Sequence, residues 1–266
     1  MFEMSDAKWC PPSLRGIVTD YIQFGVMMWR MDVEMASLLR LTLERLGVNE
    51  VVDLCSGSGG PWFRVQWMME KEGFPVKVWL TDKYPNAAAL TFARNASGGK
   101  FDFCSEPVDA TRVPETLGGF RTIFSGFHHF RPGEARDILR DAVDCQQGIA
   151  IFEITKRTAW SMLNFAATAL LVPLCVPLLR PFRWSRLLWT YLFPVATPVI
   201  LFDSLVSCLR SYSITEMRGM TEGLDAKGYT WEAGEIKPPH SPVPITFLVG
   251  YPTKNSLKVY EAFESL

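Results

Sequence analysis

Short apolar runs alternate with segments of helical pattern along much of this chain. Four runs are rich in Val, Ile, Phe or Trp and are bounded by Gly, Pro or Asp, as buried strands usually are: 50–54, 76–82, 121–127 and 148–155. A weaker run lies at 101–108. Helices are predicted between the runs, at 62–73, 86–97 and 133–145. This alternation predicts an α/β fold with a mostly parallel sheet and helices on both faces.

The first apolar run ends in a cluster of small residues. The stretch VVDLCSGSGGPWF, Val51 to Phe63, places an acid and then Gly and Ser residues directly after a predicted strand. Glycine allows the backbone to approach a ligand closely, although a plain strand-to-helix loop can have the same composition. In an open parallel sheet, ligands bind beyond the carboxyl ends of the strands. We therefore interpret this turn as a ligand-binding loop.

Acidic residues also follow other predicted strands. Asp82 ends the second run, and Asp109 follows the weaker run. A carboxylate at the tip of the second strand can accept hydrogen bonds from both hydroxyls of a ribose. The run at 121–127 leads into the sequence FSGFHHF. Because these loops share one edge of the predicted sheet, they indicate a single ligand site.

The charge and the cysteine pattern of the chain exclude some kinds of ligand and partner. The chain has 266 residues, a formal net charge of −1 and no Lys- or Arg-rich run, which argues against a nucleic-acid partner. Its six cysteines are scattered without a CxxC pair, which argues against a metal site and a disulfide framework. The first residues lack the basic start and apolar core of a secretory signal. We therefore expect a protein of the cytoplasmic side that is not secreted.

Four segments resemble, in order, the first four motifs of class I S-adenosylmethionine-dependent methyltransferases: VVDLCSGSGG, VWLTDKYPN, VDATRVP and TIFSGFHHF. The resemblance covers about 50–155 and resumes at about 211–252, where two further strand-like runs follow a helix, at 230–237 and 245–252. It implies a Rossmann-like, seven-stranded, mostly parallel sheet whose last strand is antiparallel. A Rossmann-type NAD(P) oxidoreductase fits less well, because the loop lacks a clean GxGxxG.

The resemblance also implies which residues hold the cofactor S-adenosylmethionine. The loop around Gly57 and Gly59 approaches its amino-acid part, with Asp53 beneath the loop, and Asp82 binds the ribose hydroxyls. The other implied cofactor residues are Cys55 and Ser56 in the loop, Asp109 and Ala110 at the adenine, and Ser125 and Phe127 near the sulfonium. Cys55 stands where the family usually has glycine, so we expect a negative φ there.

Two adjacent histidines are the candidate catalytic residues. Methyl transfer requires alignment of donor and acceptor, and an oxygen acceptor often also needs a base to take its proton. His128 and His129 follow the run at 121–127. One of them is predicted to orient or deprotonate the acceptor. In the alternative, one packs on the following helix and the other is exposed to solvent.

The segment 159–210 is unusually apolar. Its two uncharged runs, 162–179 and 187–202, each contain two prolines and are shorter than the ~20 residues that cross a bilayer. A spanning hairpin would also place Arg180, Arg183 and Arg186 on the far side, against the usual bias. Helices lying in the membrane surface, with these arginines at anionic headgroups, are therefore favoured. A soluble lid and a spanning hairpin remain the alternatives, and the membrane contact is expected through 160–209.

These observations predict four regions and one activity. The regions are N-terminal helices covering the cofactor crevice at 1–48, a cofactor-binding core at 49–158, the apolar insertion at 159–210, and a helix and strand pair that complete the core at 211–266. The expected activity is methyl transfer to a small apolar or lipid-like acceptor, because the apolar insertion follows the fifth strand. The alternative is a membrane-associated binding or scaffold protein that keeps a degenerate methyltransferase fold.

Overall fold

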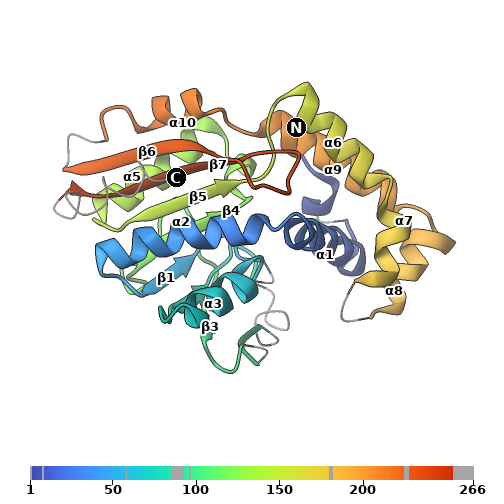
Figure 1. The fold of residues 1–266 in the computed structure, drawn as a ribbon, viewed down its shortest axis with the longest axis horizontal. Helices are drawn as coiled ribbons and strands as arrows, with labels where there is room; N and C mark the ends of the chain where they lie inside the picture. Colours follow the sequence, from blue (N-terminus) through green and yellow to red (C-terminus); the bar gives the residue numbers. More distant parts are fainter. Residues whose placement is uncertain are drawn as a thin grey trace. The chain divides into compact units, whose positions relative to one another are not determined.

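The computed structural model describes residues 2–253, apart from residues 8, 58, 86–90, 92, 96, 180–181 and 225–227. The chain forms two compact units (Figure 1). One, here called the sheet unit, consists of Asp32–Glu153, Ile214–Ile236 and Thr246–Leu266. The other, here called the helical unit, consists of Met1–Met31, Ile154–Ser213 and Lys237–Ile245.

The sheet unit is built, within the described residues, on seven strands in the order β3-β2-β1-β4-β5-β7-β6. Their bounds are β1 Glu50–Asp53, β2 Lys77–Leu80, β3 Phe101–Phe103, β4 Phe120–Phe124, β5 Ile149–Glu153, β6 Tyr229–Ile236 and β7 Ile245–Pro252. β1 pairs in parallel with β2 and β4, β2 with β3, and β4 with β5, whereas β7 is antiparallel to β5. The predicted Rossmann-like, mostly parallel sheet is confirmed.

Helices cover both faces of this sheet (Figure 1). They include α2 Met31–Leu46, α3 Trp62–Lys71, α5 Pro132–Asp144 and α10 Ile214–Thr221. The strand order reverses between β1 and β4, so right-handed crossovers place α3 and α5 on opposite faces. α10 packs against α5 and β6. The helix predicted at 86–97 lies largely outside the described residues.

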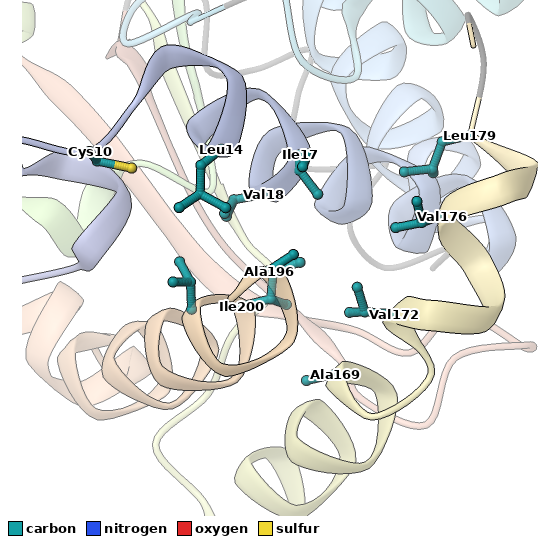
Figure 2. Close-up of a cluster of buried hydrophobic side chains, with 11 residues drawn as sticks. Cys10, Leu14, Ile17, Val18, Ala169, Val172, Val176, Leu179, Ala196 and Ile200 are labelled. Atoms are coloured by element: carbon teal, nitrogen blue, oxygen red, sulfur yellow. The ribbon is translucent and has the colours of Figure 1, made fainter. Parts of the chain in front are cut away.

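The helical unit joins the start of the chain to the apolar segment after β5. Its elements are η1 Met4–Asp6, α1 Pro12–Met28, α6 Ala159–Ala169, α7 Val172–Cys175, η3 Val176–Leu178, α8 Trp184–Leu187, η4 Leu188–Leu192 and α9 Ala196–Arg210. Figure 2 shows the small apolar side chains that α1 and these later helices bury together: Cys10, Leu14, Ile17, Val18, Ala169, Val172, Val176, Leu179, Ala196, Val199 and Ile200. Tyr21 and Phe24 pack against this core, and the Tyr21 hydroxyl donates to the carbonyl of Thr168.

Breaks divide both apolar runs into short helices. α6 meets the segment α7–η3 at 51°, and the segment α8–η4 meets α9 at 90°. Among the described residues, no single helix is both long and apolar enough to cross a bilayer. The two bent pairs satisfy that test only when their two arms are taken together, by length and composition.

A buried ion pair holds α8 against α1. The Arg186 side chain is 2% exposed and donates through Nε and Nη2 to Oδ2 of Asp20, at 3.1 and 2.5 Å. Its Nη1 donates to the carbonyl of Leu179 at 3.0 Å. The expectation that Arg186 meets lipid headgroups is therefore wrong, because this charge is neutralised inside the helical unit. Arg183 is half exposed, with Nη1 3.8 Å from the same carboxylate, and Arg180 lies outside the described residues.

Candidate active site

The loop after β1 reverses direction through left-handed backbone. The φ angles are 60° at Cys55, 55° at Gly57, 101° at Gly59 and 45° at Gly60. The predicted negative φ at Cys55 is wrong, because the chain turns immediately after the strand and imposes this conformation on a residue with a Cβ. A Cβ added at Gly57 would meet nothing within 4 Å. The loop backbone is therefore open on that side for a ligand to approach.

Hydrogen bonds fix this loop to the ends of β1 and β2. The Asp53 carbonyl accepts from the Ser56 hydroxyl at 2.8 Å and from both the backbone N–H and the hydroxyl of Thr81 at 2.9 Å. The Ser56 N–H in turn donates to the Thr81 carbonyl at 2.9 Å. Ser56 is buried, so its side chain serves to hold the loop rather than to meet a ligand.

The Asp53 carboxyl group lies buried at the end of β1, beneath the loop. Its Oδ1 accepts from the hydroxyl of Thr122 on β4 at 2.7 Å. Burial raises the pKa of Asp53 to about 6, although the hydrogen bond from Thr122 favours the ionised form and lowers it. Sequence reasoning missed Thr122, the buried hydroxyl residue in the middle of the strand FRTIF.

Asp82 connects the Gly-rich loop to the end of β2. Its Oδ2 accepts from the backbone N–H of Gly57 at 2.9 Å, and its Oδ1 accepts from the N–H of Tyr84 at 2.8 Å. The residue is partly exposed. Each carboxylate oxygen can accept more than one hydrogen bond, so both oxygens retain acceptor capacity for a ligand hydroxyl.

Asp109 lies close to Asp82, because the N–H of Val108 donates to the Asp82 carbonyl at 2.9 Å. The Asp109 Oδ2 pairs with Lys83 Nζ at 2.7 Å, and Oδ1 accepts from the N–H and hydroxyl of Thr111 at 3.0 and 2.7 Å. The hydrogen bonds from Lys83 and Thr111 lower the pKa of Asp109 to about 2. Sequence reasoning did not include Lys83 in the site.

The adjacent Ala110 is buried. Its side chain therefore offers no exposed surface to a ligand, and any adenine contact at this position belongs to the backbone, as the resemblance implies.

The loop after β4 touches the loop after β1. Ser125 has a φ of 50°, and its N–H donates to the carbonyl of Phe152 on β5 at 2.7 Å. A Cβ added at Gly126 would lie 3.4 Å from the Cβ of Cys55. Phe127 is fully buried, so its ring forms part of the floor rather than an exposed wall. The two loops predicted to share a site are therefore in contact.

A buried acid at the end of β5 holds the first histidine. Glu153 is fully buried, and its Oε2 lies 2.6 Å from Nδ1 of His128, which is also buried. Its Oε1 accepts from the backbone N–H groups of Phe127 at 2.7 Å and of His128 at 3.3 Å. The half-buried His129 ring lies 4.4 Å from the His128 ring, at 33° to it. Sequence reasoning missed Glu153, the one acid in the run GIAIFEIT.

The Cys55 thiol lies among the acids of this edge. Burial raises its pKa, and the nearby carboxylates of Asp82, Asp53 and Asp109 raise it further. Both effects disfavour the thiolate. Cys55 is therefore held as a neutral thiol.

Comparison with known proteins gives a structural likeness and no sequence relative. No protein-family model matches the chain, and no curated protein matches its sequence. The plantazolicin methyltransferase BpumL, solved in complex with SAH, matches over 93% of both chains with a TM-score of 0.56 and 10% identity. An O-methyltransferase family protein from Burkholderia thailandensis matches over 86% of this chain and 58% of its own, at 15% identity and a TM-score of 0.48.

These matches concern architecture. At 10% identity over nearly the whole of both chains, the likeness to BpumL establishes the arrangement of the sheet and its helices and nothing finer. In this chain that arrangement is the seven-stranded, mostly parallel sheet with an antiparallel β7. This chain accordingly has the Rossmann-like fold of the class I S-adenosylmethionine-dependent methyltransferases.

Proposed function

We propose that this chain is a methyltransferase that uses S-adenosylmethionine and acts on a small apolar acceptor. The observation that carries the proposal is the edge of the sheet unit where four strands end. There, Asp82 accepts from the Gly57 N–H at 2.9 Å, and the loop that carries His128 contacts the loop that carries Cys55. A cofactor cradle and a candidate base therefore lie on adjoining loops.

The residues of the first loop suit the proposed cofactor. Gly57 is left-handed with open space where a Cβ would stand, so the backbone can approach the amino-acid part. Asp82 has acceptor capacity for two ribose hydroxyls. Asp53 places a carboxyl group beneath the loop, of the charge that an ammonium group requires. When bound, S-adenosylmethionine supplies an activated methyl group carried on a positively charged sulfur.

The histidine loop suits proton removal from an acceptor hydroxyl. In the neutral ring, donation from Nδ1 to Glu153 makes Nε2 the basic nitrogen of His128. Nε2 of His128 is buried in this structure, so acceptor binding has to expose it before it takes the acceptor proton as the acceptor oxygen gains its methyl group. The imidazolium that forms is stabilised by Glu153, which touches no substrate and acts by positioning the ring. His129, whose ring lies 4.4 Å away, orients the acceptor.

The apolar segment after β5 supports an apolar acceptor. Glu153 ends β5 within the site, and the apolar helix α6 begins at Ala159. The segment from there to Phe202 has no acidic residue. The composition of this segment is therefore the ground on which we propose an apolar acceptor.

Calorimetric titration of the full chain with S-adenosylmethionine and with its demethylated product tests the proposal. Asp82→Ala should weaken binding by about 1.5 to 3 kcal/mol, the range for hydrogen bonds to a charged group. Asp137→Ala is the matched control, because Asp137 is a half-exposed acid on α5 paired with Arg140. Its affinity should equal that of the wild type.

The other outcomes separate the alternatives. Failure of the folded wild type to bind either compound would favour a binding or scaffold protein with a degenerate fold. Binding of a nicotinamide dinucleotide in their place would favour an oxidoreductase. Unchanged affinity in a folded Asp82→Ala variant would exclude Asp82 from the cofactor site. The proposal that the loop after β1 binds the cofactor would then lose its main support.

A further inference from the structure

Large apolar side chains are exposed at one end of the helical unit, where α6 gives way to α7 and where η4 gives way to α9. Leu174 is 72% exposed, Trp184 77% and Leu192 68%. We call this surface the apolar tip; its exposed members are Leu170, Leu171, Leu174, Leu178, Phe182, Trp184, Leu188, Tyr191, Leu192, Phe193 and Val195. Single exposed leucines are ordinary on a protein surface, but a group of this size marks a partner.

The members of the tip are brought together by contacts between the two arms. The Tyr191 hydroxyl donates to the carbonyl of Pro173, which joins η4 to α7. Phe182 and Trp184 pack edge to face with ring centroids 5.2 Å apart. Figure 1 shows α7 and α8 side by side at this end of the unit. The leucines of α7 and η4 therefore form one surface rather than scattered points.

The same helices bury a separate set of side chains. Val172 and Val176 lie in the core that the helices form with α1 (Figure 2). Leu174 and Leu178 on the same segment are exposed. The side chains of the apolar tip are therefore not the ones that pack against α1. The tip is a second apolar face, which stays exposed although the core of the helical unit is complete.

The charge pattern selects the kind of partner. Residues 154–202 contain five basic residues, Lys156, Arg157, Arg180, Arg183 and Arg186, and no acidic residue. Arg186 is neutralised by Asp20. Arg183, between Phe182 and Trp184 of the tip, is half exposed and lies 3.8 Å from the same carboxylate. Exposed Trp and Tyr side chains are those that favour the boundary between headgroups and acyl chains. A segment with apolar, aromatic and basic side chains and no acid of its own matches an anionic bilayer surface.

We propose that the apolar tip inserts into the headgroup boundary of a bilayer containing anionic lipid. The short, bent helices lie in the plane of the membrane and bury their leucines and aromatic rings about 5 to 10 Å deep. The proposal concerns the helical unit by itself and stands whether or not the sheet unit transfers methyl groups.

Vesicle flotation of the full chain provides the test. The probes are vesicles of phosphatidylcholine alone and vesicles with added phosphatidylglycerol. A triple variant, Leu174→Ser, Trp184→Ser and Phe193→Ser, should reduce vesicle binding at least tenfold. The matched control removes the same three residue types away from the tip: Leu209→Ser, Trp67→Ser and Phe2→Ser, all exposed in the wild type. It should bind as the wild type does, and binding by both should weaken as salt rises.

A measurement on single variants guards against misfolding of the triple variant. Brominated acyl chains quench the fluorescence of tryptophans that enter the bilayer. Trp184→Phe should abolish most of the quenching seen in the wild type, whereas Trp67→Phe should leave it unchanged.

Four results would overturn the proposal. Equal vesicle binding or equal quenching in the tip and control variants would place the contact elsewhere. A wild-type protein that is monodisperse without detergent and binds no vesicles would indicate a soluble lid. Resistance to high salt and alkaline washing would indicate a spanning hairpin. A dimer that the tip variant dissociates, without vesicle binding, would assign the tip to a second copy of the chain.

Discussion

The two units use buried charge in different ways. In the sheet unit, Asp53 and Glu153 are buried at strand ends that open onto the proposed ligand site. In the helical unit, Asp203 is buried to accept from the N–H groups of Met4 and Ser5, and Arg186 to pair with Asp20. We propose that the first pair serves binding and chemistry, whereas the second joins elements of the helical unit. Burial of a charge is therefore informative about function only when its location in the fold is also considered.

The largest effect, a loss of turnover, is expected from the buried pair of His128 and Glu153 in the sheet unit. If Glu153 positions His128 for proton removal, His128→Ala should lower turnover by about 10²- to 10⁴-fold while cofactor affinity stays unchanged. Glu153→Gln should lower turnover less and shift its pH profile. Single-turnover kinetics with separate calorimetry measures both. The exposed His240 provides the control, as His240→Gln. Full activity in His128→Ala would mean that this buried pair is structural, like those of the helical unit.

A smaller effect, on stability alone, is expected in the helical unit. Arg186→Met should lower the free energy of unfolding by about 2 to 3 kcal/mol, somewhat less than for a fully buried pair, because Asp20 stays partly hydrated. Arg140→Met removes an exposed pair with Asp137 and should cost less than about 1 kcal/mol. Urea unfolding followed by circular dichroism gives both values. Equal losses of unfolding free energy in the two variants would show that the buried ion pair contributes no more to stability than the surface pair.

The Asp53 carboxyl group should make stability depend on pH. Its pKa of about 6 lies above the unfolded value near 3.8, so the folded protein binds more protons between these limits. The free energy of unfolding should fall as pH rises from about 4 to about 6, by on the order of 2 to 3 kcal/mol, and stay level above that. Asp53→Asn keeps an acceptor for Thr122 and should lose this dependence. Parallel curves for both proteins across pH 4 to 7 would contradict the assignment.

The smallest effect is expected in the cofactor loop. Cys55→Gly should raise the free energy of unfolding by about 0.5 to 1 kcal/mol, because glycine adopts a φ of 60° without the penalty of a Cβ but loses more entropy on folding. Cys55→Ala keeps the Cβ and should give no such gain. Thermal unfolding of the two variants compares them directly. A stabilised alanine variant would trace the effect to the sulfur instead of the backbone.

Most of the sheet could be predicted from the sequence, because buried strands read as short apolar runs with clear boundaries. The sequence pattern predicts a strand at 245–252, and β7 lies at Ile245–Pro252. The pattern also predicts that the run at 121–127 continues as a strand, but β4 ends at Phe124, since Ser125 turns into left-handed backbone. The apolar pattern of the sequence does not predict where the backbone turns at the end of this strand.

The missed residues all depend on contacts between distant parts of the chain. Glu153 and His128 are brought together by the pairing of β4 with β5, so the acid reads in sequence only as the end of a strand. The sequence pattern places Arg186 at headgroups, because its partner Asp20 lies far away in the chain, on the first long helix. Residue type predicts which groups carry charge but not which of them neutralise each other.

The raised pKa of Cys55 has a chemical consequence if, as proposed, this loop binds a donor with an electrophilic methyl group. Thiolates are strong nucleophiles, and thiols are weak ones. A thiolate on the loop that cradles a methyl donor would be alkylated by it, and the loop would be blocked by its own cofactor. Burial and the acids around Cys55 keep the proton on sulfur. If the carboxylates of this edge hold the methyl donor as proposed, they would also protect the loop from self-methylation.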